Sequence, residues 1–168
     1  MSFTRSLLHR YIAAFHIEFS HRGADMRSHD KRTIYLDFDG VLHPSICPPD
    51  EFFSCLPVLA PLQSFDFDIV ISSSWRFHYT QAELAARLGE LGTKVIGQTG
   101  PAHEGAHARW HEICDHAEHH GIRRWVAVDD SAFEFPRSEA SAGRLVLCNA
   151  KTGITESETG LIMAFLRR

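Results

Sequence analysis

Short apolar runs alternate with helical periodicities along most of the chain. Five runs rich in β-branched residues predict strands, and they lie at residues 33–38, 67–72, 94–97, 125–128 and 144–148. Runs such as Ile69-Val70-Ile71 are apolar without alternation, as strands buried on both faces should be. Strands that alternate with helices predict an α/β fold, in which helices cover a central parallel sheet of about five strands.

Three helices are predicted between and after these strands. The first and the last begin with a capping box, Thr80-Gln81-Ala82-Glu83 and Thr155-Glu156-Ser157-Glu158, and the first is expected to close at Gly92. The middle helix has no such box and is expected to end near Gly121. Each helix has an apolar face at spacings typical of a helix, and these faces consist of Leu84, Leu88 and Leu91; Ala106, Trp110, Ile113 and Ala117; and Leu161, Ile162, Phe165 and Leu166.

The first 30 residues have a different pattern. Apolar side chains between Leu7 and Phe15 recur at helical spacing with basic residues among them, which favours a short peripheral helix. Two alternatives stay open: a targeting peptide, which Glu18 weakens, and a start codon assigned too far upstream, since Met26 precedes the first strand. We therefore divide the chain into an N-terminal extension, residues 1–30, and one domain, residues 31–168.

Composition and charge narrow the classes of function. A formal net charge of -4 over 168 residues predicts no basic surface of the kind that nucleic-acid-binding proteins carry, although a local basic groove is compatible with it. No run approaches the ~18 apolar residues of a membrane-spanning helix, so no membrane partner is expected. The four cysteines form no C-x-x-C pair, which suits reduced thiols and a cytoplasmic location.

Acidic and hydroxyl side chains follow three of the predicted strands. Asp37 and Asp39 end the first strand, a serine triplet (residues 72–74) ends the second, and Asp129 and Asp130 end the fourth. Because ligands bind beyond the carboxyl ends of parallel strands, we expect these groups to converge in one crevice. Carboxylates so close together repel one another, and Mg²⁺ favours a site of a few carboxylates completed by waters and phosphate.

This arrangement suits phosphoryl transfer. The reaction requires positioning and charge neutralisation, so a nucleophile, a metal and a few hydrogen-bond donors are sufficient. Of two aspartates two residues apart, one can attack phosphorus while the other protonates the leaving oxygen and later activates water. A D-x-D-G run alone is also ordinary turn chemistry, and Asp-Asp-Ser can cap a helix; the coincidence of all three strand ends favours a site.

These motifs resemble the haloacid dehalogenase (HAD) superfamily of phosphatases and phosphotransferases. Residues 37–43 (DFDGVLH) are similar to its first motif, residues 69–76 (IVISSSWR) to its second and residues 125–130 (WVAVDD) to its fourth. The S-x-W-R and W-V-A-x-D-D versions are similar to the small HAD domains associated with RNA-repair proteins. The resemblance spans about residues 33–168 and implies a Rossmann-like three-layer sandwich.

The resemblance also implies roles for the four aspartates. Asp37 would be the nucleophile that forms an aspartyl phosphate and a ligand of Mg²⁺. Asp39 would be the general acid and base and would contribute its backbone carbonyl to the metal. Asp129 would bind the metal, and Asp130 would bind it directly or through water. The expected activity is that of a Mg²⁺-dependent phosphomonoester hydrolase.

The resemblance also implies which groups hold the phosphate. Ser73 would hold it, with Ser72 as the alternative, because a serine triplet leaves the register open by one. The superfamily usually has a lysine as its third motif, and this sequence departs from that pattern. Lys94 lies inside the third predicted strand, which is early for this role, so Arg109 on the following helix is the better candidate.

The spacing between the motifs leaves no room for a large cap domain. Within the superfamily, a site without a cap implies an open crevice and a substrate that can be macromolecular, such as a phosphorylated nucleic-acid end or a nucleotide. The apolar residues of the segment 44–65 are expected to be core rather than substrate contacts. His43 and Arg76, next to the motifs, are candidate substrate contacts. The sequence does not predict the oligomeric state.

Two rival functions belong to other classes. His103-Glu104-Gly105-Ala106-His107 formally matches H-E-x-x-H, which binds zinc within a helix and would indicate a zinc hydrolase. Pro101 before it and Gly105 within it instead predict a loop that enters a helix. The other rival is a non-catalytic module that keeps the fold for binding, and the intact Asp37 and Asp39 argue against it.

Overall fold

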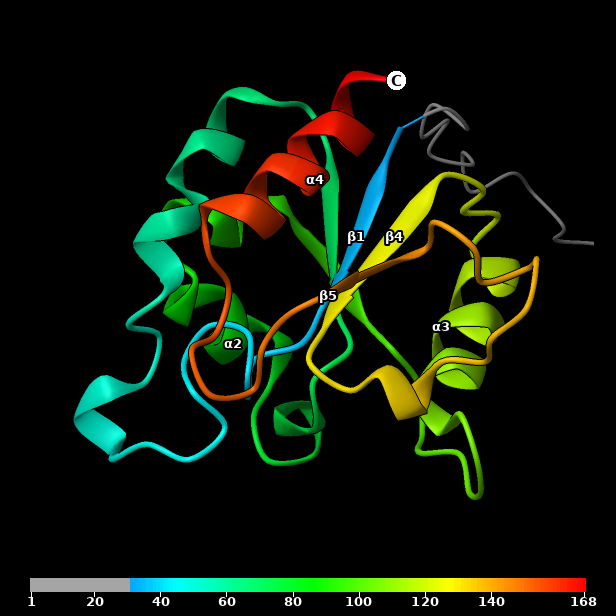
Figure 1. Ribbon diagram of the computed structural model, residues 1–168, viewed down its shortest axis with the longest axis horizontal. Coiled ribbons are helices and arrows are strands. Elements are labelled where there is room, and N and C mark those ends of the chain that lie inside the picture. Colours follow the sequence, from blue (N-terminus) through cyan, green and yellow to red (C-terminus); the bar gives the residue numbers. More distant parts are fainter. Residues whose placement is uncertain (1–30) are drawn as a thin grey trace, which may run out of the picture.

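The computed structural model of the protein describes residues 31–168 and contains one five-stranded sheet in which every pairing is parallel (Figure 1). The spatial order is β3-β2-β1-β4-β5. The strands are β1 (Thr33–Leu36), β2 (Asp68–Ile71), β3 (Val95–Gln98), β4 (Trp125–Asp129) and β5 (Leu145–Leu147). The predicted α/β class, the five strands and their approximate places are confirmed. The helix predicted within residues 1–30 lies outside the described residues.

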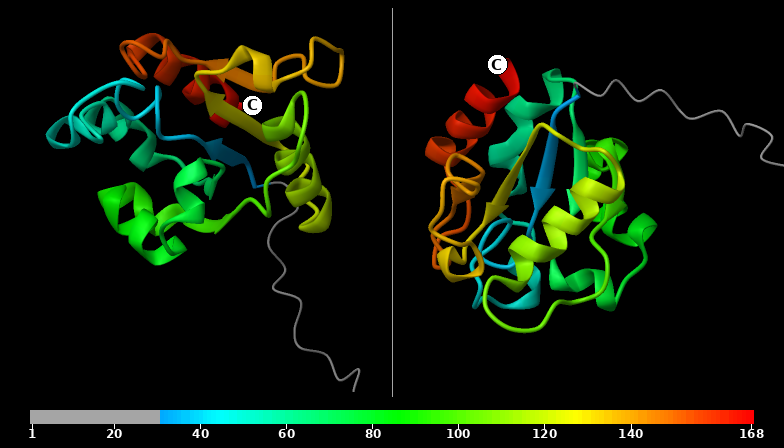
Figure 2. Two further views of the ribbon diagram at one scale, coloured as in Figure 1. Left: turned by 90° about the horizontal axis from the view of Figure 1, so that it is seen from below. Right: turned by 90° about the vertical axis from the view of Figure 1, so that its right-hand side faces the viewer.

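The three central strands, β2, β1 and β4, are buried on both faces, which explains their apolar runs, whereas the edge strands β3 and β5 are partly exposed. In β1, Ile34 and Leu36 belong to one core cluster while Tyr35 belongs to the other. The first cluster is covered by α2 (Gln81–Arg87), α4 (Glu156–Arg167) and the 3₁₀ helix η2 (Leu56–Ser64), and the second by α3 (Ala108–His119). Figure 2 shows the resulting three layers, with α3 and α4 on opposite sides of the sheet.

Two helix predictions were too long. The first predicted helix ends at Arg87, and the chain continues as a separate 3₁₀ helix, η4 (Gly89–Lys94), because Gly89 adopts a φ of 57° that interrupts the α-helix. Helix α3 begins only at Ala108, so Ala106 lies in an exposed turn before it and not on its buried face. Both predicted capping boxes, at Thr80 and Thr155, are present.

Two details of the predicted core also differ. Leu161 on α4 is exposed, whereas Ile162 and Leu166 are buried, since a single helix face cannot bury all four apolar residues. In the segment after β1, Leu59 and Leu62 are buried core residues as predicted, but Phe52 is 37% exposed.

The segments that follow β1, β2 and β4 contain mostly short helices. The segment after β1 holds η1 (Pro49–Glu51) and η2, and the segment after β2 holds η3 (Ser74–Phe77), α2 and η4. A fifth 3₁₀ helix, η5 (Ala132–Glu134), follows β4. These elements form no separate cap domain in the described part of the chain. No described helix has both the length and the hydropathy required to cross a membrane.

Candidate active site

Asp37 is the first residue after β1 and lies at the centre of the sheet's carboxyl edge. Its backbone N–H donates to the carbonyl of Val128 at 3.1 Å, which extends the pairing with β4 by one residue. Its Oδ1 accepts a hydrogen bond from the N–H of Phe38 at 2.8 Å. The Phe38 side chain turns the other way and is fully buried in the core. The alternation of the strand thus places the Asp37 carboxylate at the site while Phe38 anchors the turn.

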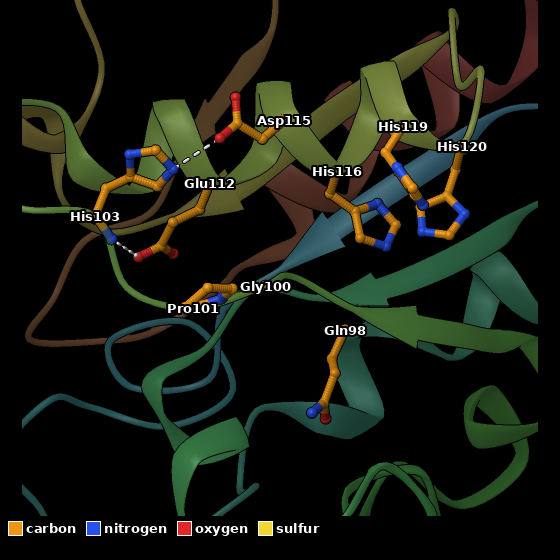
Figure 3. A pocket seen from close by; sticks show the side chains of 9 residues that line it. All are labelled: Gln98, Gly100, Pro101, His103, Glu112, Asp115, His116, His119 and His120. Atoms are coloured by element: carbon orange, nitrogen blue, oxygen red, sulfur yellow. Dashed lines mark hydrogen bonds and ion pairs between the residues drawn. The ribbon is translucent and has the colours of Figure 1, made fainter.

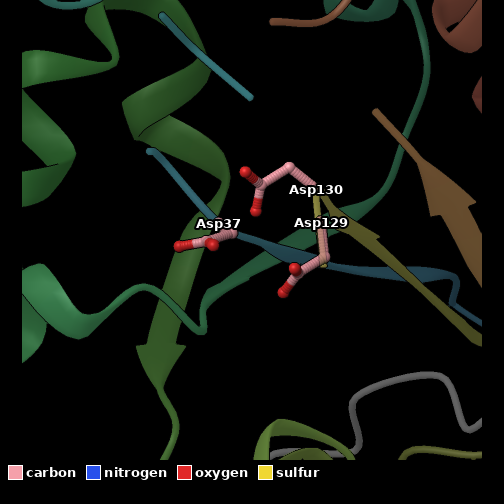
Figure 4. A group of neighbouring side chains, drawn as sticks. All are labelled: Asp37, Asp129 and Asp130. Atoms are coloured by element: carbon pink, nitrogen blue, oxygen red, sulfur yellow. The ribbon is translucent and has the colours of Figure 1, made fainter. Parts of the chain in front are cut away.

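The carboxylates of Asp37, Asp129 and Asp130 converge at this edge (Figure 4). One oxygen of each lies within 4.8 Å of the others, although the residues come from two different strands. Asp129 ends β4, and its Oδ1 accepts from the N–H of Ser131 at 2.9 Å. Asp130 accepts through Oδ2 from the hydroxyl of Ser45 at 2.8 Å. The predicted convergence of the strand ends is therefore present in the structure.

Gly40 lets the chain after β1 pass close to these carboxylates. Its φ is 68°, and a Cβ at this position would lie 2.0 Å from Oδ2 of Asp130 and 2.5 Å from Oγ of Ser45. Any side chain would therefore displace Asp130 in addition to straining the backbone.

Arg109 supplies positive charge to the same cluster. Its Nη1 atom lies 3.4 Å from Oδ1 of Asp37 and 3.6 Å from Oδ2 of Asp129, and its Nε lies 3.7 Å from Oε2 of Glu112. Burial alone would lower the pKa of Arg109, but the attraction of Asp37 and Asp129 raises it above the ordinary value. Arg109 therefore stays charged at the site.

Lys94, the alternative cation, lies at the opposite end of the sheet. It is the last residue of η4, immediately before β3, and not within the strand as predicted. Its Nζ donates to the carbonyl of Phe65 at 2.7 Å and lies 4.9 Å from the centre of the Phe67 ring. Since the carboxylates are at the carboxyl ends of the strands, Lys94 cannot reach them.

The environment of Asp129 disfavours its charged form. Burial first, and then the negative charge of Asp37, raise the pKa of Asp129 to about 7, against the opposing effect of Arg109. Its Oδ2 atom and the Nη1 atom of Arg109 are buried without a hydrogen-bond partner among the described residues. A buried carboxylate oxygen of this kind is a ready ligand for a cation.

Asp39 is not a member of the three-carboxylate cluster, although it lines the same cleft. Its Oδ1 lies 3.1 Å from Nε2 of His43, and its Oδ2 accepts from Nε1 of Trp75 at 2.9 Å. The two aspartates of the D-x-D-G run thus have different surroundings.

The serine triplet is split between the interior and the cleft. Ser72 and Ser73 are buried, and the Ser73 hydroxyl accepts from the N–H of Trp75 at 3.4 Å. Ser74 is exposed and lines the cleft. Ser73, with Ser72 as the alternative, was predicted to hold the phosphate, whereas Ser74 is the serine of the triplet that lines the cleft, because the turn of the backbone after a strand can direct any of three serines toward a ligand.

Arg76, a candidate substrate contact, makes most of its contacts within the protein. It is only 6% exposed, and its guanidinium donates to the carbonyls of Ser72, Ser73 and Gly100 at 2.8, 2.9 and 3.2 Å. Its Nη2 atom also pairs with Oε2 of Glu112 at 2.7 Å. Arg76 therefore holds the backbone after β2 in place, although its side chain still lines the cleft.

Glu112 was not singled out from the sequence. It is buried between Arg76 and Arg109 and thus links the loop after β2 to helix α3. A signal was present, because Glu112 precedes the apolar-face residue Ile113 and follows Arg109 by three positions, a spacing at which helical side chains meet.

The site is an open cleft of about 370 Å³. Ser74 and Phe77 come from the segment after β2, and Ala108 and Arg109 from the start of α3. The full lining consists of Asp37, Asp39, Ser74, Arg76, Phe77, Ala108, Arg109, Glu112, Asp129, Asp130, Ser131 and Glu134. Six carboxylates and two guanidinium groups face this space, so an anionic substrate would need additional positive charge to bind.

A family model described as the HAD domain in Swiss Army Knife RNA repair proteins matches residues 33–159. The chain belongs to this family. Comparison with curated proteins and with solved structures found no significant match. The resemblance inferred from the motifs is confirmed, as is the Rossmann-like α/β fold. Membership supports hydrolase chemistry of the HAD type in general.

The histidine-rich segment of this HAD domain does not form the H-E-x-x-H arrangement of zinc hydrolases. His103 lies in a loop, and His107 is the residue before α3, with a φ of 60°. His103 bonds Asp115 at 2.8 Å, whereas His107 bonds the carbonyl of Phe133 at 2.8 Å. The two imidazoles therefore serve separate contacts, and the three-aspartate cluster alone meets metal-site geometry among the described residues.

Several of these histidines line a second cleft of about 450 Å³ beside the first (Figure 3). His116, His119 and His120 stand at the end of α3, opposite Gln98. The ring of His116 is anchored by the hydroxyl of Tyr35, 3.0 Å from its Nδ1. Burial, followed by the nearby His120, lowers the pKa of His116 to about 4.

Proposed function

We propose that this HAD domain is a Mg²⁺-dependent phosphomonoester hydrolase that works through an aspartyl phosphate on Asp37. The observation that carries the proposal is the meeting of three carboxylates from β1 and β4 with one buried guanidinium, that of Arg109. This set can hold a divalent cation on one side and a phosphate on the other. Neither a binding module nor a structural domain requires such a costly concentration of buried charge.

The residues present fit Mg²⁺. Asp37, Asp129 and Asp130 offer hard oxygen ligands, and the buried Oδ2 of Asp129 has no hydrogen-bond donor among the described residues. The position of Asp39, two residues after Asp37, also suits the backbone-carbonyl ligation expected from the family. A bound Mg²⁺ supplies positive charge that draws the phosphate oxygens into the acidic cleft and offsets the charge of the reacting groups.

The proposed chemistry divides the work between Asp37 and Asp39. An oxygen of Asp37 attacks phosphorus while the bond from phosphorus to the leaving oxygen breaks, and Asp39 gives that oxygen a proton. Water then attacks the aspartyl phosphate, Asp39 takes the proton from the water, and inorganic phosphate leaves with the Asp37 carboxylate restored. Oδ1 of Asp37 is engaged by Phe38 and Arg109, which leaves Oδ2 as the attacking oxygen.

Arg109 is the proposed cation of the third motif. Its Nη1 atom lies beside Asp37 and has no hydrogen-bond partner among the described residues, so it can donate to an oxygen of the transferred phosphate. Its planar guanidinium would steady both the nucleophile and the phosphate, as lysine does in relatives with the usual motif. On the other side of the cleft, the hydroxyl of Ser74 and the backbone around Ser73 are the proposed partners of the phosphate.

The proposed substrate is a phosphorylated nucleic-acid end. The family description names RNA repair proteins, and the cleft is open, with no cap domain in the described residues. The ring of Phe77 lines the cleft, is 52% exposed, and rests on the guanidinium of Arg76 at 4.1 Å. The exposed ring can stack on a terminal base while the phosphate enters the acidic cleft.

Hydrolysis of p-nitrophenyl phosphate and of a phosphorylated oligonucleotide tests the proposal. We expect turnover with Mg²⁺ and none in chelator, and we expect the Asp37→Asn variant to be inactive because an amide cannot attack phosphorus. Asp66→Asn is a matched control, since Asp66 is exposed and pairs with Lys31 at 2.9 Å, away from the cleft. Full activity of Asp37→Asn would refute the mechanism.

A further inference from the structure

Both oxygens of the Asp39 carboxylate are contacted by residues from two different segments of the chain. Trp75, in the 3₁₀ helix η3 after β2, donates its Nε1–H to Oδ2 at 2.9 Å. His43, in the loop after β1, places Nε2 3.1 Å from Oδ1. An aspartate side chain that is 43% exposed would ordinarily sample several rotamers. Here two directional contacts restrict it to one.

The structure also determines which nitrogen of His43 carries the hydrogen. The backbone N–H of Phe53 donates to Nδ1 of His43 at 3.4 Å, so Nδ1 must present a lone pair. In a neutral imidazole the other nitrogen then bears the hydrogen, and Nε2–H donates to Asp39. Both contacts to Asp39 are therefore donations, and both favour the same orientation of its carboxylate.

His43 is enclosed in a way that prevents its ring from rotating. It is 1% exposed, and its ring centre lies 4.8, 5.7 and 5.9 Å from those of Phe52, Phe53 and Trp75. The backbone adds a bridge between residues 39 and 43, which fixes the distance between Asp39 and His43. This burial corrects the prediction that His43 contacts substrate, because a buried ring behind Asp39 faces the protein.

We propose that His43 and Trp75 are positioning residues that hold Asp39 in the orientation from which it passes a proton to the leaving oxygen and recovers one from water. The inference rests on the proposed function, in which Asp39 is the general acid and base. His43 touches Asp39 and the aromatic cluster, and it acts on the reaction only through Asp39. The role explains two motif residues, His43 of DGVLH and Trp75 of SSSWR, that the catalytic chemistry does not otherwise use.

The proposal predicts an effect that depends on the leaving group. An alkoxide leaving group needs the proton of Asp39, whereas p-nitrophenolate leaves readily without it. Because kcat/KM reports the steps up to departure of the leaving group, we expect His43→Leu and Trp75→Phe to lower kcat/KM for glycerol phosphate by about 10- to 100-fold, the usual range for misplaced proton transfer. For p-nitrophenyl phosphate, kcat/KM should change by less than about 3-fold, while kcat falls because water attack still requires Asp39.

Conservative variants separate positioning from packing. His43→Gln keeps a side-chain N–H near the place of Nε2 and should recover most of the glycerol phosphate activity that His43→Leu loses. Trp75→Phe keeps an aromatic ring but removes the Nε1–H donor together with part of the ring. Trp110→Phe is its matched control: Trp110 lies on α3 and packs against Trp125 of β4 and Phe135, so the variant loses a similar part of a ring and should leave the turnover of both substrates unaffected. If His43→Leu fails to fold, Trp75→Phe still tests the proposal.

Two outcomes would overturn the inference, and a third would point to the proposed function instead. Equal losses for both substrates in His43→Leu and Trp75→Phe would indicate a general structural role. Wild-type kinetics in both variants would show that Asp39 needs no positioning. An Asp39→Asn variant without any preference between leaving groups would remove the acid and base role of Asp39 itself, which is the failure of the proposed mechanism and not of the positioning alone.

Discussion

The Nη1 atom of Arg109 lies 3.4 Å from Oδ1 of Asp37, although the strands β2 and β3 lie between these two residues in the sequence. The contact joins the first turn of α3 to the end of β1, and the same nitrogen lies 3.6 Å from Asp129 of β4. A guanidinium shared between the proposed nucleophile, Asp37, and a proposed metal ligand, Asp129, can offset the negative charge of both. This geometry supports the proposal that Arg109 is the third-motif cation of this HAD domain.

Replacing Arg109 should therefore impair catalysis strongly. We expect Arg109→Ala to lower kcat/KM by about 10²- to 10³-fold, the loss typical for one donor aimed at developing charge. Arg109→Lys should retain part of the activity, because it keeps the charge but not the fork of donors. Lys94→Ala, measured in the same phosphatase assay, should stay within about 2-fold of wild type, given the distance of Lys94 from the cleft. The reverse ranking of Arg109→Ala and Lys94→Ala would contradict the assignment.

The pKa of Asp129, raised to about 7, predicts a pH dependence of stability in the metal-free protein. The folded state holds this proton more tightly than the unfolded chain, whose aspartate titrates near 3.8, so the free energy of unfolding falls as pH rises from about 4 to about 7. Asp129→Asn lacks this titration and should gain stability relative to wild type across that window. In chelator, the difference between the melting temperatures of Asp129→Asn and the wild type should grow by at least about 3 °C from about pH 4 to about pH 7, which corresponds to roughly 1 kcal/mol in the free energy of unfolding.

Magnesium should remove this difference. At pH 7.5, Mg²⁺ should raise the melting temperature of the wild type, because binding to the folded state alone stabilises it, and should raise that of Asp129→Asn much less. Equal shifts for both proteins would show that Asp129 is not a ligand.

A side chain at Gly40 should damage the metal site directly. Gly40→Ala adds a Cβ that would lie 2.0 Å from Oδ2 of Asp130, at a φ of 68°. Gly121→Ala is a matched control, since Gly121 has a φ of 66° with nothing within 4 Å of its Cβ position. Both variants should lose about 1–2 kcal/mol from backbone strain, and Gly40→Ala alone should lose more than that and bind Mg²⁺ more weakly by calorimetry. Equal losses of stability and of Mg²⁺ affinity in the two variants would mean that Asp130 can move without weakening the proposed metal site.

Phe77 should distinguish substrates that carry a base next to the phosphate. We expect Phe77→Ala to raise KM for a phosphorylated oligonucleotide about 10-fold, as loss of one base stack commonly does. KM for the same oligonucleotide with an abasic phosphorylated end should be unchanged. Phe77→Trp keeps an aromatic ring and should therefore keep the lower KM for the end that carries a base. Phe133→Ala serves as the control for an exposed phenylalanine that does not line the cleft. An equal rise in KM for both ends would rule out stacking.

Most of the fold could be predicted because its signals are local. After their first residues, Thr33 and Asp68, the strands 33–36 and 68–71 are unbroken apolar runs, and that pattern is typical of strands between two layers of helices. The capping boxes at Thr80 and Thr155 involve residues three apart in sequence, and both form. Predictions failed where one backbone torsion decided the outcome, as at Gly89 and His107, whose positive φ values end or delay a helix.

The site could be predicted in part for the same reason. Asp37, Asp129 and the serine triplet follow strands, and parallel strands bring their carboxyl ends to one edge. The choice between Arg109 and Lys94 depended on which end of the sheet each reaches, and Lys94 turned out to precede β3. Glu112 and Ser74 were missed because their importance comes from neighbours that are remote in sequence.

The sequence by itself determined that this chain forms a parallel α/β domain and that acidic side chains follow two of its strands, because strand alternation and topology impose both. Only the tertiary structure decided how the two aspartates of Asp37-Phe38-Asp39 differ. Asp37 meets Asp129, Asp130 and Arg109 from β4 and α3, whereas Asp39 is held by His43 and Trp75. Hydrogen bonds and charge pairs act over a few ångströms in space, and those distances are not encoded in the spacing of residues along the chain.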